Sequence, residues 1–536
     1  MSIIADTVFS NGPVITVDPT DRVCEAVAVR GNRIVHVGDA ADMKALIGPE
    51  TRVIDLKGRC LLPGFIDVHC HPGLHASVKI QIPCSPRHAG SIEELKAAVK
   101  RRAADTPKGG WILGWGYDHT ALREQRHPNR WDLDQAAPEH KVFLSRTCGH
   151  IAAVNSRVLE AFGMSSSTPD PPGGKIERDR EGQPTGVLFE KAKSQIQDHI
   201  RPSLEDLKKG LPLMNQDFLS RGITSAEDAS GWDALEIRAF QEAARENLIQ
   251  IRLHFMVRLA PPEIKVGDHF LESGLFTGFG NDKLRLGALK LMVDGSGSGG
   301  SAAMREPYPD NPENHGILWL NQEELDNHVL LGHLAGYQVA VHAIGDRDVD
   351  MTLQSFERAL KAYSRPDHRH RIEHCGFVDE AMLARIHQLG VVPVLGLPFL
   401  YELGDAYLTA FGHDRLENAY PLKRFVDRGV VSPLSSDTPV IDPNPLHGIY
   451  FALSRKTKSG QSIFPAESVD LMTAIRSYTA FSAYATFEEH LKGSLEPGKL
   501  ADLIVLSGNI LETPVDDLLD LKVGLTMVDG NVVYER

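Results

Sequence analysis

The chain has 536 residues, enough for one large catalytic domain and a smaller companion, and its 42% hydrophobic and 24% charged residues are ordinary for a globular enzyme. Its formal net charge of −14 argues against nucleic acid or an anionic membrane surface as the main partner, but it does not bear on a small neutral substrate. We expect no membrane span, because the chain has no run of about 18 apolar residues. It also has no basic region followed by an apolar run at its N-terminus, and its six cysteines form no CxxC pair. We therefore expect a cytoplasmic protein with reduced thiols.

Short strands with tight turns are predicted at both ends of the chain. Residues 1–60 contain several β-branched runs separated by Asp, Pro and Gly residues. Residues 490–536 contain one such run at 501–506, followed by a hairpin that turns at Asp529 and Gly530. We predict that the two ends together form one small sheet domain.

Residues 61–489 alternate apolar, β-branched runs with helical stretches, a pattern typical of βα units around a parallel sheet. The runs are continuously hydrophobic, as expected for strands that are buried on both faces. They lie at 65–69, 223–227, 251–257, 286–293, 339–342, 371–374, 391–395 and 430–435. Eight such strands would close a (β/α)₈ barrel.

The first two runs are separated by a segment that is too long for one crossover helix. This segment has strand-like pieces of its own at 111–116 and 142–145, and a Pro/Gly-rich stretch at 168–174 that we interpret as a loop. We predict that residues 75–215 form an insertion over the mouth of the barrel.

Four histidines and one aspartate fall at the ends of predicted strands. His69 and His71 are two residues apart, so their side chains point to the same side of the strand, which is a suitable start for a zinc-type site. The pair alone could arise by chance among 23 histidines. However, His342, His374 and Asp437 also end strands, and catalytic residues of barrel enzymes lie at the carboxyl ends of several strands. Together they predict a metal site.

These residues resemble the amidohydrolase superfamily, and within it the branch of amidohydrolase family 3 that includes N-substituted formamide deformylase. The resemblance covers nearly the whole chain and includes the segments at 62–67, 341–346 and 497–503. It implies a distorted (β/α)₈ TIM-like barrel, a small β-sandwich built from both chain ends and a long insertion after the first barrel strand.

The resemblance also implies a binuclear centre, with zinc as the expected metal. In this family pattern the first ion is held by His69, His71, Lys290 and Asp437, and the second by Lys290, His342 and His374. Lys290 would carry a CO₂-derived carboxylate that bridges the two ions. A lysine inside an apolar strand is unusual in itself, and pairing with Asp294 or Asp437 is the alternative explanation. Asp437 would act as general base and then general acid.

Other residues have weaker claims to a place in the site. His150 is a candidate catalytic residue that binds the substrate carbonyl or stabilises developing charge, although packing within the insertion explains it nearly as well. Trp115 and Tyr117 could line the substrate pocket or pack in a core. Asp294 could be a substrate contact or support the metal ligands, and Asp228 is a strand-end carboxylate without an assigned role.

The function that we predict is hydrolysis of a C–N bond in an amide-like small molecule: an N-acyl, N-formyl, carbamate or cyclic amide substrate. The nearest alternative is a metal-dependent deaminase of a heterocyclic amine. Deaminases of this superfamily usually carry a glutamate three residues after the fifth-strand histidine and lack the bridging lysine, whereas this chain has Gly345 and Lys290. A non-catalytic barrel that serves as an assembly protein is a third possibility, but such a chain should have lost metal ligands. Relatives are often dimers, which makes a homodimer one candidate assembly, and the sequence leaves the oligomeric state open.

Overall fold

The computed structural model describes residues 4–147, 149, 151–171, 174–197, 199–231, 234–259, 265–309 and 311–536. The chain forms two compact units, one of residues Met1–Pro72 with Asn215–Arg536 and one of residues Gly73–Met214. The second unit follows the first barrel strand, which confirms the predicted long insertion at that point. No helix in the described part of the chain is long and apolar enough to cross a bilayer.

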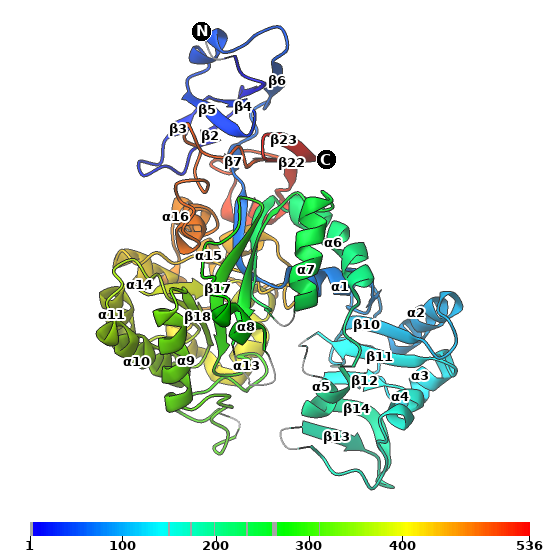
Figure 1. The fold of residues 1–536 in the computed structure, drawn as a ribbon. Coiled ribbons are helices and arrows are strands. Elements are labelled where there is room, and N and C mark those ends of the chain that lie inside the picture. Colours follow the sequence, from blue (N-terminus) through cyan, green and yellow to red (C-terminus); the bar gives the residue numbers. More distant parts are fainter. Residues whose placement is uncertain are drawn as a thin grey trace. The chain divides into compact units, whose positions relative to one another are not determined.

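A seven-stranded parallel sheet forms the centre of the larger unit (Figure 1). In hydrogen-bonded order, its strands are β20 (Val392–Leu395), β19 (Arg371–His374), β18 (Val339–Ala343), β17 (Leu284–Met292), β16 (Arg252–Arg258), β15 (Ile223–Asp228) and β8 (Phe65–Cys70). Their side chains are almost entirely buried, which explains why the runs are continuously hydrophobic rather than alternating. The predicted distorted (β/α)₈-type barrel is confirmed.

The predicted eighth strand at 430–435 is wrong as a regular strand. This segment makes a single parallel bridge between Leu434 and Leu395. Pro433 has no N–H to donate to a ladder, although its carbonyl accepts from Leu395 N at 2.8 Å. Leu434 N donates to Ser477 O at 2.9 Å and not to a neighbouring barrel strand, so no regular ladder continues along this segment. The sheet is nearly closed by this segment rather than by a full strand.

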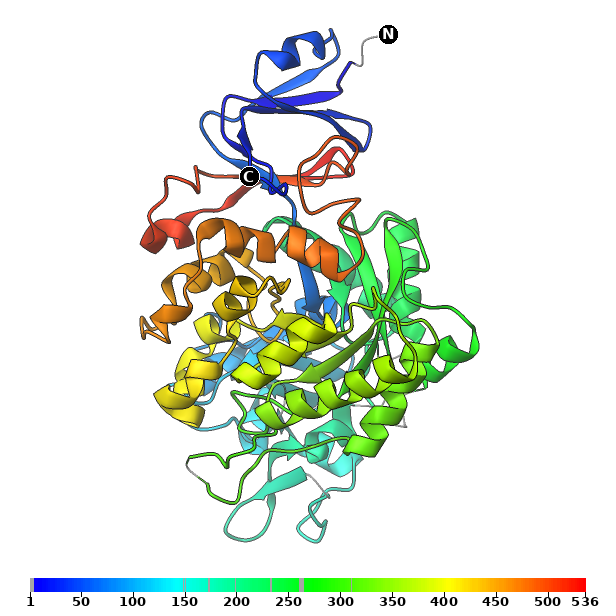
Figure 2. The ribbon, with the colours of Figure 1, turned by 90° about the vertical axis from the view of Figure 1, so that its left-hand side faces the viewer.

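The two chain ends form two further sheets that share one apolar core, as the resemblance implies (Figure 2). One sheet contains β5 (Arg33–Gly38), β4 (Ala26–Arg30), β1 (Thr7–Ser10) and β6 (Arg52–Asp55). The other contains β23 (Asn531–Glu535), β22 (Val523–Val528), β21 (Leu503–Leu506), β7 (Leu61–Pro63), β2 (Val14–Ile15) and β3 (Val23–Cys24). The β22–β23 turn has positive φ at both Asp529 and Gly530, the conformation that a two-residue hairpin needs. The predicted β-sandwich is therefore confirmed.

The unit Gly73–Met214 is built around a six-stranded mixed sheet. Its strands, in order, are β13 (Gly174–Arg178), β14 (Pro184–Glu190), β12 (Ile151–Val154), β11 (Lys141–Arg146), β10 (Trp111–Tyr117) and β9 (Ile82–Pro83). Its apolar core includes Leu95, Ile112, Val142 and Leu144. The unit therefore has a core of its own.

Helices follow most of the barrel strands, and Figure 1 shows α9, α10 and α11 on one flank of β17 and β18. The α-helices are α1 (Pro72–Lys79), α2 (Ile92–Asp105), α3 (Arg130–Ala136), α4 (Ser156–Ala161), α5 (Lys191–Gln197), α6 (Leu204–Leu219), α7 (Ala234–Arg245), α8 (Val266–Glu272), α9 (Gln322–Leu334), α10 (Asp346–Ala362), α11 (Glu380–Leu389), α12 (Phe399–Glu402), α13 (Gly404–Arg415), α14 (Leu422–Asp427), α15 (Pro445–Ser454), α16 (Leu471–Ser477) and α17 (Ala480–Ala485). The helix α11 shows how local sequence sets such bounds. Asp379 accepts from Met382 N at its start, and Gly390 ends it in the left-handed conformation.

Candidate metal centre

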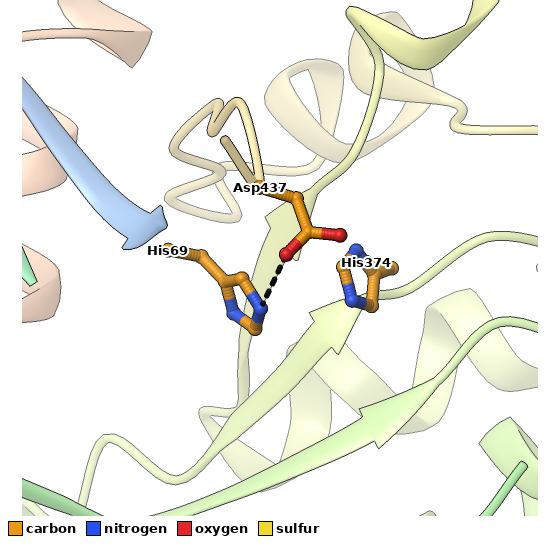
Figure 3. Close-up of side chains that lie close together, drawn as sticks. All are labelled: His69, His374 and Asp437. Atoms are coloured by element: carbon orange, nitrogen blue, oxygen red, sulfur yellow. Dashed lines mark ion pairs between the residues drawn. The ribbon is translucent and has the colours of Figure 1, made fainter. Parts of the chain in front are cut away.

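Three side chains from distant parts of the sequence meet at the carboxyl ends of the barrel strands (Figure 3). His69 lies near the end of β8, His374 ends β19, and Asp437 follows the segment that bridges to β20. Each offers a ligand atom, and these atoms all lie within 4.8 Å of one another. His69 is 1% exposed and His374 2% exposed, so both imidazoles are held away from solvent.

Backbone hydrogen bonds hold this group together. Asp437 N donates to His69 O at 2.9 Å, and His71 N donates to Thr438 O at 2.9 Å. His374 and Asp437 both have positive φ, 66° and 55°, which is uncommon outside glycine and asparagine. Such strain is concentrated at functional sites, where the surrounding structure imposes it.

His71 extends the group on the side of Asp437. Its Nε2 lies 2.8 Å from Asp437 Oδ1, and its Nδ1 lies 2.9 Å from Ser230 Oγ. His69 Nε2 is 3.5 Å from the same Asp437 oxygen. His69 of β8 and His71, which follows the strand, therefore both face one carboxylate.

Lys290 lies on the fourth barrel strand, with Nζ 3.4 Å from His69 Nε2. Its side chain is 2% exposed. Burial lowers the pKa of its ammonium group to about 8, because the charged form is poorly solvated. Among the described residues no carboxylate lies within ion-pair distance of its Nζ, although the nearby carboxylates of Glu373 and Asp437 attract its charge.

His342 lies beside His374, with ring centroids 4.5 Å apart. Its Nε2 is 3.2 Å from Asp294 Oδ1 and 3.0 Å from Gly295 O. Asp294 is fully buried, and its oxygens also accept from backbone N–H groups of Ala303 and of residues 344–345. Asp294 therefore orders the loops beside the site and orients His342, which favours the supporting role over the substrate contact.

His374 provides a direct test of whether this site suits a metal ion. Its Nδ1 is buried and has no hydrogen-bond partner within the part of the chain that the structure describes. An unpaired buried nitrogen is costly unless another group binds it. Imidazole nitrogens and a carboxylate oxygen are the donor set that zinc and similar divalent ions prefer. The residues present therefore fit a divalent metal.

The electrostatics of the group agree with this fit. Burial lowers the pKa of His69 and of His374 well below the usual value, which keeps both imidazoles neutral with a free lone pair. Burial by itself would raise the pKa of Asp437, but the hydrogen bond from His71 and the nearby histidines outweigh it and hold that pKa below its usual range. The carboxylate is therefore ionised.

A chain of ionic contacts inside the barrel holds His69, and the sequence interpretation missed it. His69 Nδ1 contacts Glu373 Oε2, and Arg371 Nε donates to the other oxygen of Glu373 at 2.6 Å. Arg371 also pairs with Glu227 of β15 and donates to Val68 O at 2.7 Å. Because Glu373 takes the Nδ1 side of His69, the Nε2 side faces the metal group. Two charged residues within a fully buried strand, Arg371 and Glu373, were the available signal.

Replacing Arg371 by methionine should lower the free energy of unfolding by about 3–5 kcal/mol, because Glu227 and Glu373 would keep buried charges without their partner. Chemical denaturation would measure this. Arg358→Met, which removes a surface guanidinium paired with Asp326, is the control and should cost under about 1 kcal/mol. Equal losses in both variants would contradict the proposed role of Arg371.

Trp115 and Tyr117 belong to the unit Gly73–Met214, whereas Asp228 belongs to the larger unit and lies near His71. Tyr117 of β10 is buried in the core of the unit Gly73–Met214, with its hydroxyl 3.0 Å from His127 Nδ1. Trp115 is half-buried on the same strand. Asp228 is buried at the end of β15, and burial raises its pKa to about 6. His150 lies outside the described residues, and its role stays a prediction.

Comparison with known proteins gives consistent results across nearly the whole chain. A model described as the amidohydrolase family matches residues 52–534. Protein LONG AFTER FAR-RED 3 of Arabidopsis thaliana is 31% identical over 550 residues, covering 99% of this chain and 92% of that protein. N-substituted formamide deformylase of Arthrobacter pascens is 28% identical over 551 residues, covering 100% and 99%. The crystal structure of an uncharacterized metal-dependent hydrolase from Pyrococcus horikoshii matches with a TM-score of 0.78 and 26% identity, covering 95% of this chain and 99% of that one.

Proposed function

This chain belongs to the amidohydrolase family and is a metal-dependent hydrolase of C–N bonds other than peptide bonds, and from this premise we propose that it hydrolyses an amide-like small molecule with Asp437 as the proton-transfer group. The observation that carries the proposal is the buried group of His69, His374 and Asp437, in which one imidazole nitrogen has no partner among the described residues. Such a group is costly to bury without a metal and well suited to hold one.

We assign the ligands as the family pattern suggests. His69, His71, Lys290 and Asp437 would hold one ion, and Lys290, His342 and His374 would hold the other, with zinc as the expected metal. The contact between Lys290 Nζ and His69 Nε2 and the position of His71 beside Asp437 support the first set. We expect the second ion to bind more weakly, because His342 Nε2 lies against Asp294 and Gly295.

Lys290 acquires its ligand oxygens by reaction with CO₂. The neutral amine nitrogen attacks the carbon of CO₂, forms one N–C bond and loses a proton, which leaves a carbamate anion. This change removes the buried cation near His69 and His374 and supplies an anionic ligand in its place. The burial of Lys290 away from solvent supports this assignment.

The bound ions lower the pKa of a water molecule and polarise the scissile carbonyl. Residues of this chain transfer the protons and position the carboxylate. Asp437 accepts a proton from the attacking water, the water oxygen adds to the carbonyl carbon, and Asp437 returns the proton to the amine as the C–N bond breaks. His71 Nε2 holds the carboxylate in place at 2.8 Å, and Glu373 fixes the orientation of His69.

The environment of His374 favours a substrate with an apolar part. The ring of Phe399 lies nearly parallel to that of His374, with centroids 5.5 Å apart, and Leu397, Leu400 and Tyr401 around it are buried. Together with the relative that is named for deformylation of N-substituted formamides, this favours N-formyl and N-acyl derivatives of hydrophobic or aromatic amines.

A hydrolysis screen of the metal-replete protein tests the function. It should include N-formyl amines, N-acyl amino acids, carbamates, lactams and heterocyclic amines, with release of amine or ammonia as the readout. We expect turnover of at least one amide-like class. Turnover confined to heterocyclic amines, with release of ammonia, would support a deaminase instead.

Removal of the metal should abolish hydrolysis, and addition of zinc should restore it. Loss of the ions would leave His374 Nδ1 buried without a partner, so the thermal unfolding temperature should also fall. Elemental analysis before and after treatment with a chelator gives the metal content. Full activity in protein that holds no zinc, manganese or iron would contradict the proposed mechanism.

A further inference from the structure

A pocket lies at the opposite end of the barrel from the metal centre. Its volume is about 300 Å³, in the range of sites for small ligands. Its lining includes Arg285 and Leu286 at the start of β17 and Gln338 immediately before β18. Because the strands are parallel, these positions lie at their amino ends, whereas the metal group lies at the carboxyl ends.

The lining holds two arginines, Arg285 and Arg365, and two carboxylates, Glu227 and Asp367, which pair with cations outside the lining. Arg365 donates to the carbonyls of His333, Gly336 and Tyr337 at 2.8–3.1 Å, and none of the described carboxylates pairs with it. Asp367 also lines the pocket but is paired with Arg369 at 2.7 Å. The guanidinium of Arg365 therefore keeps an uncompensated charge.

Arg285 is the second cation of the lining. Its Nη2 lies 3.6 Å from Asp282 Oδ1, and its other acid, Glu488, is shared with further cations. Its Nη1 lies 3.5 Å from Glu488 Oε1, while His254 Nε2 lies 3.0 Å and Lys492 Nζ 2.5 Å from the other oxygen of Glu488. The Nε of Arg285 is buried and has no hydrogen-bond partner within the described residues. An unsatisfied guanidinium N–H at a pocket wall is suited to a carboxylate, which accepts charge-assisted hydrogen bonds.

Aromatic rings form the apolar part of the lining. Phe276 is 55% exposed and lies against Gly336, and Phe487 also faces the pocket. An exposed phenylalanine beside a cavity gains free energy when an apolar group covers it. The pocket thus combines two cationic side chains with two phenylalanine rings.

The floor of the pocket reaches the ionic contacts that hold the metal ligand. Glu227 lines the pocket, and its Oε1 lies so close to Gly287 that a Cβ there would approach to 2.2 Å. The other oxygen of Glu227 pairs with Arg371, which binds Glu373 and, through it, His69. The pocket and the metal centre therefore share this buried ionic chain.

We propose that this pocket is an effector site for a small organic carboxylate with an aromatic or branched apolar body. The carboxylate binds between Arg285 and Arg365, and the apolar body packs on Phe276 and Phe487. Binding displaces Glu227 and, along the ionic chain, alters the hydrolytic rate at the metal centre. The binding step does not depend on the proposed function. The effect on the hydrolytic rate rests on the proposed function.

Calorimetric titration of the metal-loaded protein with 3-phenylpropionate tests the binding step. We expect saturable binding that Arg285→Gln and Phe276→Ala each weaken about 10-fold or more, because one removes the charge-assisted contact and the other the apolar wall. Among the described residues, the side chain of Arg285 makes only ion pairs of 3.5–3.6 Å, and Phe276 is exposed, so both variants should fold. Lys283→Gln removes a cation near the start of the same strand that does not line the pocket, and should bind as the unmodified protein does.

Two further arms separate this site from the metal centre. The uncharged analogue 3-phenylpropanamide should bind at least about 10-fold more weakly than the carboxylate. Lys290→Ala should bind 3-phenylpropionate with unchanged affinity, since its side chain belongs to the metal group. Absence of binding, or binding lost in Lys290→Ala but retained in Arg285→Gln, would overturn the effector site.

In steady-state assays 3-phenylpropionate should change kcat/KM of the unmodified enzyme but not of Arg285→Gln. Binding without such a change would overturn the coupling between the pocket and the metal centre.

Discussion

Asp437→Asn is expected to lower kcat by about 10³-fold, within the range that a positioned general acid–base contributes. Asparagine keeps an oxygen that can lie beside His71 and His69, but it cannot accept the proton of the attacking water or return it to the leaving amine. The measurement is steady-state kinetics on the best substrate from the screen, with metal content determined on the same sample. A variant that keeps its metal and loses its rate would support proton transfer by Asp437.

Asp427→Asn is the matched control, because Asp427 is an exposed carboxylate that pairs with Lys423 on α14. Its kcat should stay within a factor of about two of the unmodified enzyme, since surface ion pairs contribute little. If Asp437→Asn retained most of its rate with full metal content, another group would have to move the proton.

Lys290→Ala should lower kcat at least about 100-fold and reduce the bound metal from two ions to one. Loss of a residue that only supports a ligand already costs about 10–100-fold, and a bridging ligand should cost more. Elemental analysis gives the metal content. Nuclear magnetic resonance of the unmodified protein after exchange with ¹³C-bicarbonate should show a carbamate carbon that is absent from Lys290→Ala.

Lys290→Arg tests whether activity needs carboxylation of the side chain or only a buried cation of similar size. Arginine keeps a buried cation of similar length but remains protonated, so it cannot form the carbamate. It should therefore lose activity as the alanine variant does. Two bound ions in Lys290→Ala, or no carbamate signal in active protein, would contradict the bridging role of Lys290.

Much of the fold could be predicted from the sequence because its signals are local. Continuous apolar runs mark strands buried on both faces, and Asp529-Gly530 marks a hairpin turn, whatever the rest of the chain does. The run at 430–435 fails as a strand because Pro433 cannot donate to a ladder and because Leu434 N finds Ser477 O, some forty residues further on. Apolar character alone does not distinguish a strand from a buried bridging segment.

For the metal group too, the sequence determines local properties and the tertiary structure determines long-range contacts. The sequence by itself determined that His69, His71, Lys290, His342, His374 and Asp437 lie on or directly after the predicted strands, since strand period and position along the chain are local properties. Only the tertiary structure decided which ligand atoms face one another. It brings His69, His374 and Asp437 within 4.8 Å, turns His342 Nε2 toward Asp294, and leaves His374 Nδ1 unpaired among the described residues.

The sequence could not predict the ionic chain through Arg371 or the pocket at the amino ends of the strands, because both depend on long-range contacts. Glu227, Arg371 and His69 are separated by more than 140 positions in sequence, and their contacts exist only because the sheet curves until β8, β15 and β19 face one interior. Strand positions follow from the order of residues along the chain. The pairing of buried charges follows from closure of the barrel, because only there does each charge lack water and need a partner.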